Sequence, residues 1–137
     1  MNELKIIEFL KIGEMGTGYI SIAELTGLIP FEVKRVFWTY FTPESVVRGR
    51  HAHYETQMVI VAVAGRIVAT VEMKGKLESF VLDSPTRGLY LPPKSWHTLQ
   101  YSHNAVQLVL SSTAYDEKDY IRDYETFLKL EKADNIP

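Results

Sequence analysis

The chain has 137 residues, of which 46% are hydrophobic and 23% are charged. This length and composition predict one globular domain over residues 1–137 and exclude a disordered tail or a fibrous repeat. The formal net charge of −2 excludes a whole-protein field that would attract nucleic acid or an anionic membrane. Cysteine is absent, which excludes disulfide frameworks, thiolate metal sites and cysteine nucleophiles.

The N-terminal residues lack the features of a secretory leader. Residues 1–6 carry neither a basic start nor the long apolar run that such a leader needs. The longest apolar run, Met58 to Ala64, is far too short to span a membrane. The sequence therefore predicts a cytoplasmic protein with no membrane partner.

Short segments rich in β-branched and aromatic residues, separated by Gly, Pro or polar turns, account for most of the chain. They cover residues 35–41, 57–64, 66–73, 77–82, 89–91, 97–101 and 106–111. Residues 57–64 are almost wholly apolar, as in a strand buried on both faces, whereas residues 66–73 alternate between apolar and polar side chains. Strands at this spacing predict an all-β sandwich or small barrel.

The two ends of the chain depart from this pattern. Near the C-terminus, apolar and aromatic residues recur at helical spacing, at Tyr120, Ile121, Tyr124, Phe127 and Leu128. Asp116 or Asp119 is the candidate N-cap of that helix. The first segment, up to Ile22, fits either a helix or an edge strand. We expect a jelly roll with one short C-terminal helix lying across it.

The stretch that points to chemistry is Arg48-Gly49-Arg50-His51-Ala52-His53. In an extended chain, His51 and His53 lie on the same face, with their Cα atoms about 6–7 Å apart. Two imidazoles on one face can bind a metal or can act as acid and base on a substrate. The alternative is that both are polar side chains at the mouth of a barrel, satisfied by neighbouring backbone.

A metal site needs further ligands, and the candidates are His97 and Gln57. A neutral amide offsets the charge of a divalent ion less well than a carboxylate does, which weakens this alternative. Acid–base chemistry needs only a pocket and a histidine whose pKa lies near its ordinary value of about 6.5. Arg48 and Arg50 beside the pair suit an anionic substrate such as a phosphate ester.

Four motifs, in this order along the chain, resemble one family. They are Ile29-Pro30-Phe31-x-Val33-Lys34-Arg35-Val36, Arg48-Gly49-x-His51-Ala52-His53, Gly88-Leu89-Tyr90-Leu91-Pro92-Pro93 with Trp96, and Tyr115-Asp116-Glu117-x-Asp119-Tyr120-Ile121-Arg122-Asp123-Tyr124. Over residues 22–127 the chain resembles the dTDP-4-oxo-6-deoxyhexose 3,4-ketoisomerases, the small cupins of the WxcM-like group.

The resemblance implies a cupin double-stranded β-helix and a homodimer whose subunits exchange strands. It implies conversion of dTDP-4-keto-6-deoxyglucose to a dTDP-3-keto-6-deoxyhexose through an enediol, in the synthesis of 3-amino-3,6-dideoxy sugars for surface glycans. No metal and no other cofactor is expected, in keeping with the lack of a Gly-rich dinucleotide motif. The configuration of the product at C4 and the identity of the nucleotide stay open on the residues alone.

Carried over onto this chain, the resemblance assigns the proton transfers jointly to His51 and His53. The residues expected to bind substrate are Arg48, Arg35, Gln57, Tyr40 and His97. Trp96 is expected to pack at the barrel mouth, and the motif over residues 115–124 is expected to pack without a catalytic role.

Three positions depart from the family's pattern. Thr17 stands where an arginine is expected, Tyr54 where a lysine is expected, and Phe37 where a tyrosine is expected. Tyr40 or Tyr54 is the candidate to replace the hydroxyl that Phe37 lacks. The departures leave open a non-catalytic nucleotide-sugar-binding cupin. Two further alternatives are a 3,5-epimerase, which also uses histidine as base, and a metal-dependent oxygenase that uses His51, His53 and His97.

Overall fold

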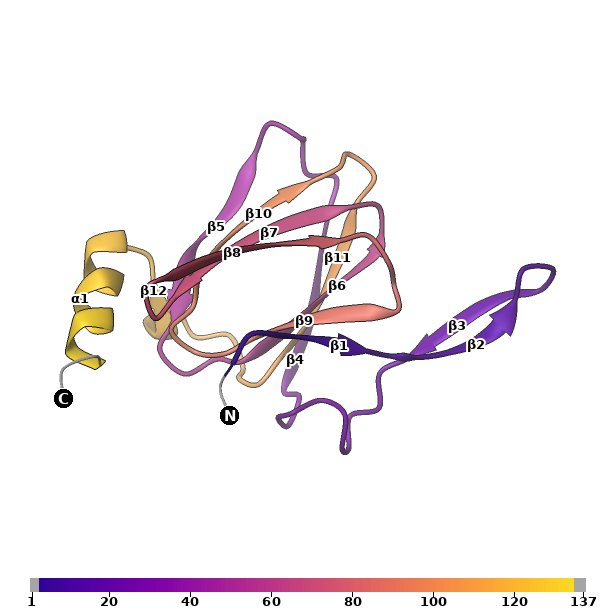
Figure 1. Cartoon of the computed structure of the whole chain (residues 1–137), viewed down its shortest axis with the longest axis horizontal. Helices are drawn as coiled ribbons and strands as arrows, with labels where there is room; N and C mark the ends of the chain where they lie inside the picture. The colour runs from indigo at the N-terminus through magenta and orange to yellow at the C-terminus, as the bar shows by residue number, and fades with distance from the viewer. Residues whose placement is uncertain (1–2, 135–137) are drawn as a thin grey trace.

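The computed structural model describes residues 3–134, so residues 1–2 and 135–137 of the predicted domain lie outside the described residues. Two five-stranded antiparallel sheets face each other (Figure 1). The first sheet has the order β1 (Lys5–Glu8), β9 (Arg87–Leu91), β6 (Met58–Ala64), β11 (Val106–Ser111), β4 (Arg35–Tyr40). The second has the order β12 (Tyr120–Ile121), β5 (Val47–His53), β10 (Trp96–Tyr101), β7 (Ile67–Met73), β8 (Lys76–Leu82). The predicted jelly roll is confirmed.

The core between the sheets comes from the alternation visible in the sequence. On β7, Ile67, Ala69 and Val71 are fully buried between the sheets, and the residues between them are half-buried. On β6 both faces are buried over Met58–Ala62 because residues 23–33 cover the outer face of the first sheet. The alternation predicted for residues 66–73 is confirmed over β7, whereas the burial on both faces predicted for residues 57–64 is found over Met58–Ala62 and not at Val63 and Ala64, which are exposed.

The first segment, which fits helix or strand, forms strands throughout. After β1, residues Leu10–Glu14 (β2) and Gly18–Ile22 (β3) form a two-stranded hairpin that projects from the barrel (Figure 1). Ile12 lies opposite Ile20 in this hairpin, and both are exposed. Isoleucine at alternate positions favours a strand over a helix.

The C-terminal helix starts later than the sequence predicts. Helix α1 covers Tyr124–Asp134, whereas Tyr120 and Ile121 form β12 against His53 and Ala52 of β5. The N-cap is Asp123, whose carboxylate accepts bonds from the Thr126 backbone N–H (3.0 Å) and hydroxyl (2.8 Å).

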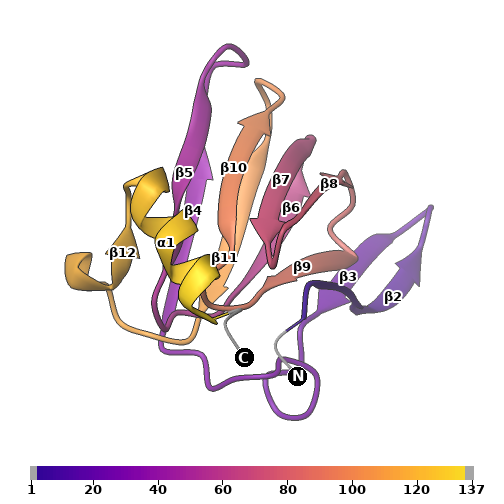
Figure 2. The ribbon, with the colours of Figure 1, turned by 60° about the vertical axis from the view of Figure 1, so that its left-hand side comes forward.

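The two predicted N-caps are therefore wrong for this helix. Asp116 instead caps the 3-10 helix Glu117–Asp119, and Asp119 binds the turn after β5. Helix α1 lies over one end of the second sheet (Figure 2), and its Phe127 packs with Ala52 and Ile121 there. In the described part of the chain, no helix is long and apolar enough to cross a membrane.

A bulge in β5 sets the position of the histidine motif. Thr98 pairs with Gly49 and His97 pairs with His51, so Arg50 is an extra residue without a partner on β10. Gly49 and Arg50 both have positive φ, +84° and +58°. A Cβ atom on Gly49 would lie 2.8 Å from the carbonyl oxygen of His97, which leaves room only for glycine.

We predict that Gly49→Ala destabilises the fold. The left-handed backbone costs alanine about 1–2 kcal/mol, and overlap with the His97 carbonyl adds about 1–3 kcal/mol. Gly75→Ala is the matched control, because Gly75 has φ +75° but nothing within 4 Å of an added Cβ. Urea unfolding of both variants measures the difference. Equal losses in the two variants would contradict the close approach at Gly49.

Candidate active site

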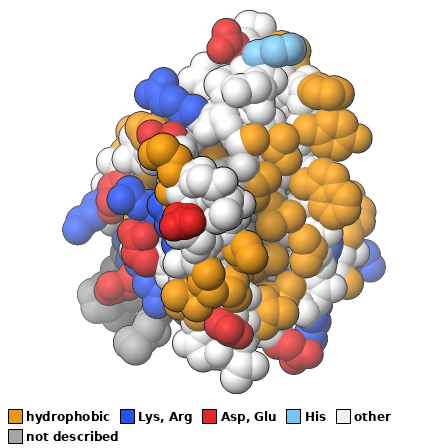
Figure 3. Space-filling model, turned by 90° about the vertical axis from the view of Figure 1, so that its right-hand side faces the viewer, with side chains coloured by type: hydrophobic (Ala, Val, Ile, Leu, Met, Phe, Trp, Pro, Cys, Tyr) orange, Lys and Arg blue, Asp and Glu red, His pale blue; other side chains and the backbone are white. Residues whose placement is uncertain are grey.

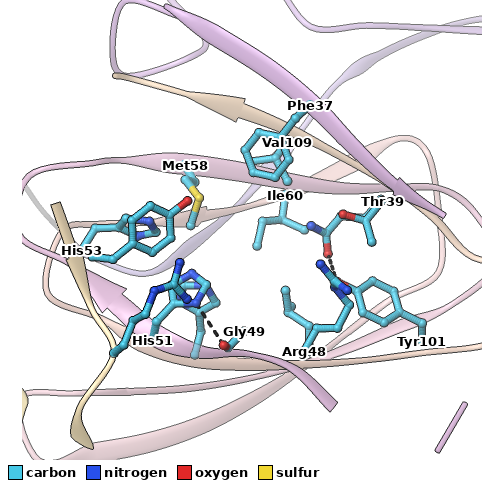
Figure 4. A pocket seen from close by; sticks show the side chains of 15 residues that line it. Phe37, Thr39, Arg48, Gly49, His51, His53, Met58, Ile60, Tyr101 and Val109 are labelled. Atoms are coloured by element: carbon cyan, nitrogen blue, oxygen red, sulfur yellow. Dashed lines mark hydrogen bonds between the residues drawn. The ribbon is translucent and has the colours of Figure 1, made fainter. Parts of the chain in front are cut away.

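A cavity of about 240 Å³ lies between the two sheets (Figure 4). Its walls are apolar, formed by Phe37, Met58, Ile60, Leu99 and Val109. Its polar residues gather at two ends. One end has His51, His53, His97 and Tyr120, with Arg122 at the rim; the other has Thr39, Arg48, Tyr101 and Gln107. The cavity therefore has a histidine end and an arginine end.

The three imidazoles at the histidine end are in mutual contact. The ring centroid of His51 lies 5.0 Å from that of His53 and 4.7 Å from that of His97. Tyr120 covers the pair, with its ring centroid 4.5 Å from His53 and 5.0 Å from His51. His51 and His53 thus share one cavity. Within residues 3–134, no group of three or more His, Cys, Asp or Glu side chains is arranged to hold a metal ion.

Backbone carbonyls fix the tautomers of two of these rings. The Nδ1 atom of His51 lies 3.0 Å from the Gly49 oxygen, and that of His97 lies 3.2 Å from the Ser95 oxygen. A carbonyl only accepts, so each neutral ring carries its proton on Nδ1 and leaves Nε2 with a free lone pair. The Nε2 atom of His53 is buried and has no hydrogen-bond partner among the described residues.

Burial keeps this end of the cavity uncharged. Desolvation, followed by the charge of His51 and then that of Arg35, lowers the pKa of His53 to about 3. Desolvation also lowers the pKa of His97 to about 3. The pKa of His51 is lowered by burial too, although its bond to Gly49 opposes the change. All three imidazoles are therefore neutral at neutral pH.

Asp119 connects the histidine strand to β12. Its carboxylate accepts bonds from the backbone N–H groups of Glu55 (2.9 Å) and Thr56 (3.1 Å) and from the Thr56 hydroxyl. Its carbonyl oxygen accepts a bond from the Tyr54 N–H (2.9 Å). These bonds fix the turn that follows His53 and hold the adjacent Tyr120 over the histidines.

An ion pair stands at the rim of the histidine end. Arg122 lies 4.4 Å over the ring of Tyr120 and binds Glu117 through two nitrogens, one of them at 3.1 Å. The Tyr115 hydroxyl donates to the same carboxylate at 2.7 Å. Hydrogen bonds from Arg122 and then from Tyr115 lower the pKa of Glu117 to about 2, so this carboxylate stays charged. Arg122 is therefore already neutralised by a carboxylate.

Sequence reasoning missed Tyr120 and Arg122 as cavity residues. It assigned the segment to a helix and to packing, but Tyr120 and Arg122 line the cavity while Ile121, between them, is buried on the other side. Tyr120, Ile121 and Arg122 alternate polar, apolar, polar, which is the period of a strand. This alternation was the signal in the sequence that could have placed Tyr120 and Arg122 on one face.

The expected substrate-binding residues are not all in the cavity. Arg48 and His97 line it, at opposite ends. Arg35 lies at the start of β4, outside the lining; it donates to the Ser111 hydroxyl (3.2 Å), and its Nε atom is buried without a partner among the described residues. Gln57 accepts a bond from the Tyr90 hydroxyl (2.6 Å) and also lies outside the lining.

The tyrosines expected to replace the missing hydroxyl of Phe37 lie elsewhere in this chain. Tyr40 is 56% exposed on the outer side of β4, and Tyr54 is 39% exposed beyond β5; neither lines the cavity. The phenols that do line it are Tyr101 and Tyr120.

Trp96 packs beneath α1, as predicted. Its ring centroid lies 5.2 Å from that of Tyr124 and 5.7 Å from that of Phe127. The indole is therefore engaged by the helix and does not line the cavity.

Comparisons with known proteins agree with this geometry. The family described as FdtA: WxcM-like, C-terminal matches residues 2–132. The TDP-4-oxo-6-deoxy-alpha-D-glucose-3,4-oxoisomerase of Aneurinibacillus thermoaerophilus is 38% identical over 128 residues, which cover 93% of this chain and 91% of that protein.

Two crystal structures of 3,4-ketoisomerases are also similar over almost their whole length. One is a mutant of QdtA from Thermoanaerobacterium thermosaccharolyticum in complex with TDP-4-keto-6-deoxyglucose; it has a TM-score of 0.93 at 27% identity and covers 100% of this chain and 99% of that one. The other, from Helicobacter canadensis, has a TM-score of 0.90 at 32% identity and covers 96% of this chain and 99% of that one.

The buried neutral imidazoles predict that the unfolding free energy decreases as the pH is lowered. Unfolded histidines bind protons below their ordinary pKa of about 6.5, whereas folded His53 and His97 resist protonation until about pH 3. The unfolded state therefore binds more protons in this window, and each histidine removes up to about 1.4 kcal/mol of unfolding free energy per pH unit as the pH drops.

Urea unfolding between pH 7.5 and 4.5 measures this slope. We expect His97→Gln to flatten it, whereas His103→Gln, at an exposed turn residue, leaves it unchanged. Imidazole nitrogen shifts in an NMR titration identify the protonation state directly. An imidazolium signal from His53 above pH 6 would contradict the prediction.

Proposed function

The chain belongs to the WxcM-like, C-terminal family, and on this premise we propose that it is a sugar 3,4-ketoisomerase. Its substrate is dTDP-4-keto-6-deoxyglucose and its product a dTDP-3-keto-6-deoxyhexose. The observation that carries the proposal is the pair of neutral imidazoles, His51 and His53, on one wall of a cavity between the sheets. The named activity of the 38% identical relative supports it.

The reaction is an internal transfer of protons. The C4 ketone acidifies the C3 hydrogen; a neutral imidazole removes it as a proton while the C4 oxygen takes up a proton, and an enediol forms across C3 and C4. A proton then returns to C4 while the C3 hydroxyl gives up its own proton, so that the C3 oxygen becomes the ketone. No electrons leave the sugar, so no co-reactant is required. His51 and His53 exchange these protons jointly, because both present an unpartnered Nε2 atom to this end of the cavity.

The neighbours keep both bases neutral and in position. After desolvation and the charge of His51, the charge of Arg35 also lowers the pKa of His53, which keeps that imidazole unprotonated at neutral pH. His97, with its own Nδ1 held by Ser95, contacts the His51 ring. Tyr120 covers both catalytic rings.

The ring chemistry of the substrate sets its orientation. In a pyranose, C1 lies opposite C4, so a sugar with C3 and C4 at the histidine end directs its C1 diphosphate toward the arginine end. Within residues 3–134, no carboxylate pairs with Arg48, whereas Glu117 neutralises Arg122 at the other end. Electrostatics therefore favours the diphosphate beside Arg48.

The nucleotide extends beyond the cavity, whose 240 Å³ suit a hexose but not the whole sugar nucleotide. A second hollow, of about 500 Å³, shares Thr39 and Arg48 with it and is lined by Trp38, Tyr40 and Phe41. We assign the thymidine part to this hollow, which keeps Tyr40 among the substrate-binding residues. Gln57 is left out, because its amide oxygen is bound to Tyr90 outside the cavity.

We also propose a homodimer that exchanges the β2–β3 hairpin. The hairpin pairs only with itself within the described chain, and it exposes Leu10, Ile12 and Ile20. Strand β4 is a sheet edge whose outer face exposes Val36, which lies outside the hollow assigned to the thymidine part. Figure 3 shows apolar side chains gathered over much of the face seen from the hairpin end. Exchange of the hairpin would cover this surface.

The proposed reaction consumes a nucleotide-activated sugar, and on that ground we assign it to the cytoplasm. Its product suits the synthesis of 3-amino-3,6-dideoxy sugars for surface glycans, since amination at C3 requires the ketone that this reaction creates.

Proton NMR in deuterium oxide with dTDP-4-keto-6-deoxyglucose tests the reaction. We expect deuterium at C4 together with a 3-keto product, and loss of about 10²–10⁴-fold in rate in His51→Asn and in His53→Asn, because each removes a proton-transfer group. Both variants should still bind TDP. Substrate binding without deuterium incorporation by the wild-type protein would instead establish a non-catalytic sugar-nucleotide-binding protein.

Light scattering after size-exclusion chromatography tests the dimer. We expect twice the 15.7 kDa of one chain. The double variant Ile12→Glu, Ile20→Glu places two charges on one face of the hairpin and should shift the protein toward the monomer. Leu77→Glu, at a residue that is 70% exposed on β8, is the control for adding charge to an apolar surface. A wild-type monomer at all concentrations would refute the exchange.

A further inference from the structure

A row of three polar side chains crosses the arginine end of the cavity. Tyr101 on β10 and Gln107 on β11 come from opposite sheets and are 4% and 3% exposed. The Tyr101 hydroxyl donates to the Gln107 amide oxygen at 2.7 Å. Arg48 of β5 lies beside the same phenol (Figure 4), close enough for its guanidinium to act on the pKa of the Tyr101 hydroxyl. The three side chains form a relay between the sheets.

The donor and acceptor roles among these three side chains can be assigned in one way only. A guanidinium has donors and no acceptor, so the Tyr101 hydroxyl cannot give its proton to Arg48. Burial raises the pKa of Tyr101 to about 12, although Arg48 opposes the rise, and the hydroxyl keeps its proton at neutral pH. That proton is directed to Gln107, which must therefore turn its oxygen to Tyr101. The two N–H bonds of the Gln107 amide then lie on the side away from Tyr101.

The Gln107 amide nitrogen is open to the cavity. It has no hydrogen-bond partner within residues 3–134, and it is not among the buried unpartnered atoms there. Gln107 lines the cavity, so its nitrogen is available to a ligand. Together with Arg48, it gives this end hydrogen-bond donors, while the amide oxygen is turned to Tyr101.

We propose that Gln107 is a specificity-determining residue that donates from its amide nitrogen to an oxygen of the glycosyl diphosphate. The Arg48–Tyr101 pair orients that amide, and Tyr101 is its positioning residue. This inference rests on the proposed function and adds to it the group that recognises the C1 end of the substrate.

The chemistry of the substrate matches the donors that Gln107 and Arg48 present at this end. The glycosidic oxygen and the phosphoryl oxygens at C1 carry no proton, so each can accept from Gln107 or Arg48. The C3 hydroxyl, in contrast, carries a proton that neither the Gln107 amide nitrogen nor Arg48 can accept. An unpaired polar group in a buried site is costly, so the relay disfavours a sugar bound in the reverse orientation.

Gln107→Glu tests the proposal without changing the size of the side chain. The carboxylate can still accept from Tyr101, but it has lost the donors and faces the diphosphate. We expect the KM for the sugar nucleotide and the Kd for TDP to rise about tenfold or more at pH 8, with kcat changed far less. The penalty should shrink toward pH 5.5 relative to the wild type, as the new carboxyl group takes up a proton. A merely structural role would not produce this pH dependence.

Tyr101→Phe tests the positioning step. The Gln107 amide is then free to turn, and we expect the KM and the Kd for TDP to rise by about three- to tenfold. Tyr90→Phe is the matched control, because Tyr90 is equally buried and also donates to a glutamine, Gln57 (2.6 Å), outside the cavity. It should lose thermal stability but keep the wild-type KM and Kd.

The outcomes separate this inference from the function on which it rests. If the wild-type protein neither binds TDP nor converts the sugar nucleotide, the proposed function fails and this inference fails with it. If the wild-type protein does both, and both folded variants keep the wild-type KM and Kd, only the inference is overturned. A rise in KM with unchanged Kd for TDP supports it and identifies the glycosidic oxygen as the acceptor.

Discussion

The pairing of β5 between β10 and β12 determines the polar chemistry of the cavity. Strand β5 carries Arg48, His51 and His53, and its bulge at Gly49 lets His51 face the cavity while the Gly49 carbonyl holds the His51 ring. On one side, β10 brings His97 and Tyr101; on the other, β12 brings Tyr120 over the histidines. One strand thus links the residues to which we assign proton exchange with the arginine to which we assign the diphosphate, so a displacement of β5 would disturb both ends of the cavity together.

The two ends differ in how their polar groups are satisfied. At the histidine end, burial keeps the imidazoles neutral, because charging them would cost solvation that no nearby carboxylate repays. At the arginine end, Arg48 is a permanent cation that has no carboxylate partner in the described chain, and it lies beside the Tyr101 hydroxyl. A neutral base and a fixed cation in one small cavity suit a substrate whose reacting carbons and phosphates lie at opposite ends of one sugar ring.

Much of the fold follows from local patterns, but the site does not. The strands of the two sheets and the pairing of His51 with His53 on one face come from alternation, which depends only on neighbouring residues. The segment from Tyr120 was misassigned because aromatic residues at mixed spacing satisfy both periods, and pairing with β5 decides between them. The bond between Gln57 and Tyr90, and that between Tyr101 and Gln107, join different strands. No sequence pattern at one position contains that information.

The three departures from the family's pattern affect the cavity unequally. Phe37 lines its apolar wall, so the missing hydroxyl is a change inside the site. Thr17 lies in the exposed turn of the β2–β3 hairpin, and Tyr54 lies beyond the end of β5; neither contacts this cavity. Tyr120 places another phenol directly over His51 and His53, with Arg122 stacked on its outer face. The phenol that the family pattern supplies from β4 therefore has a counterpart on the opposite sheet, and the acid–base pair itself is unchanged.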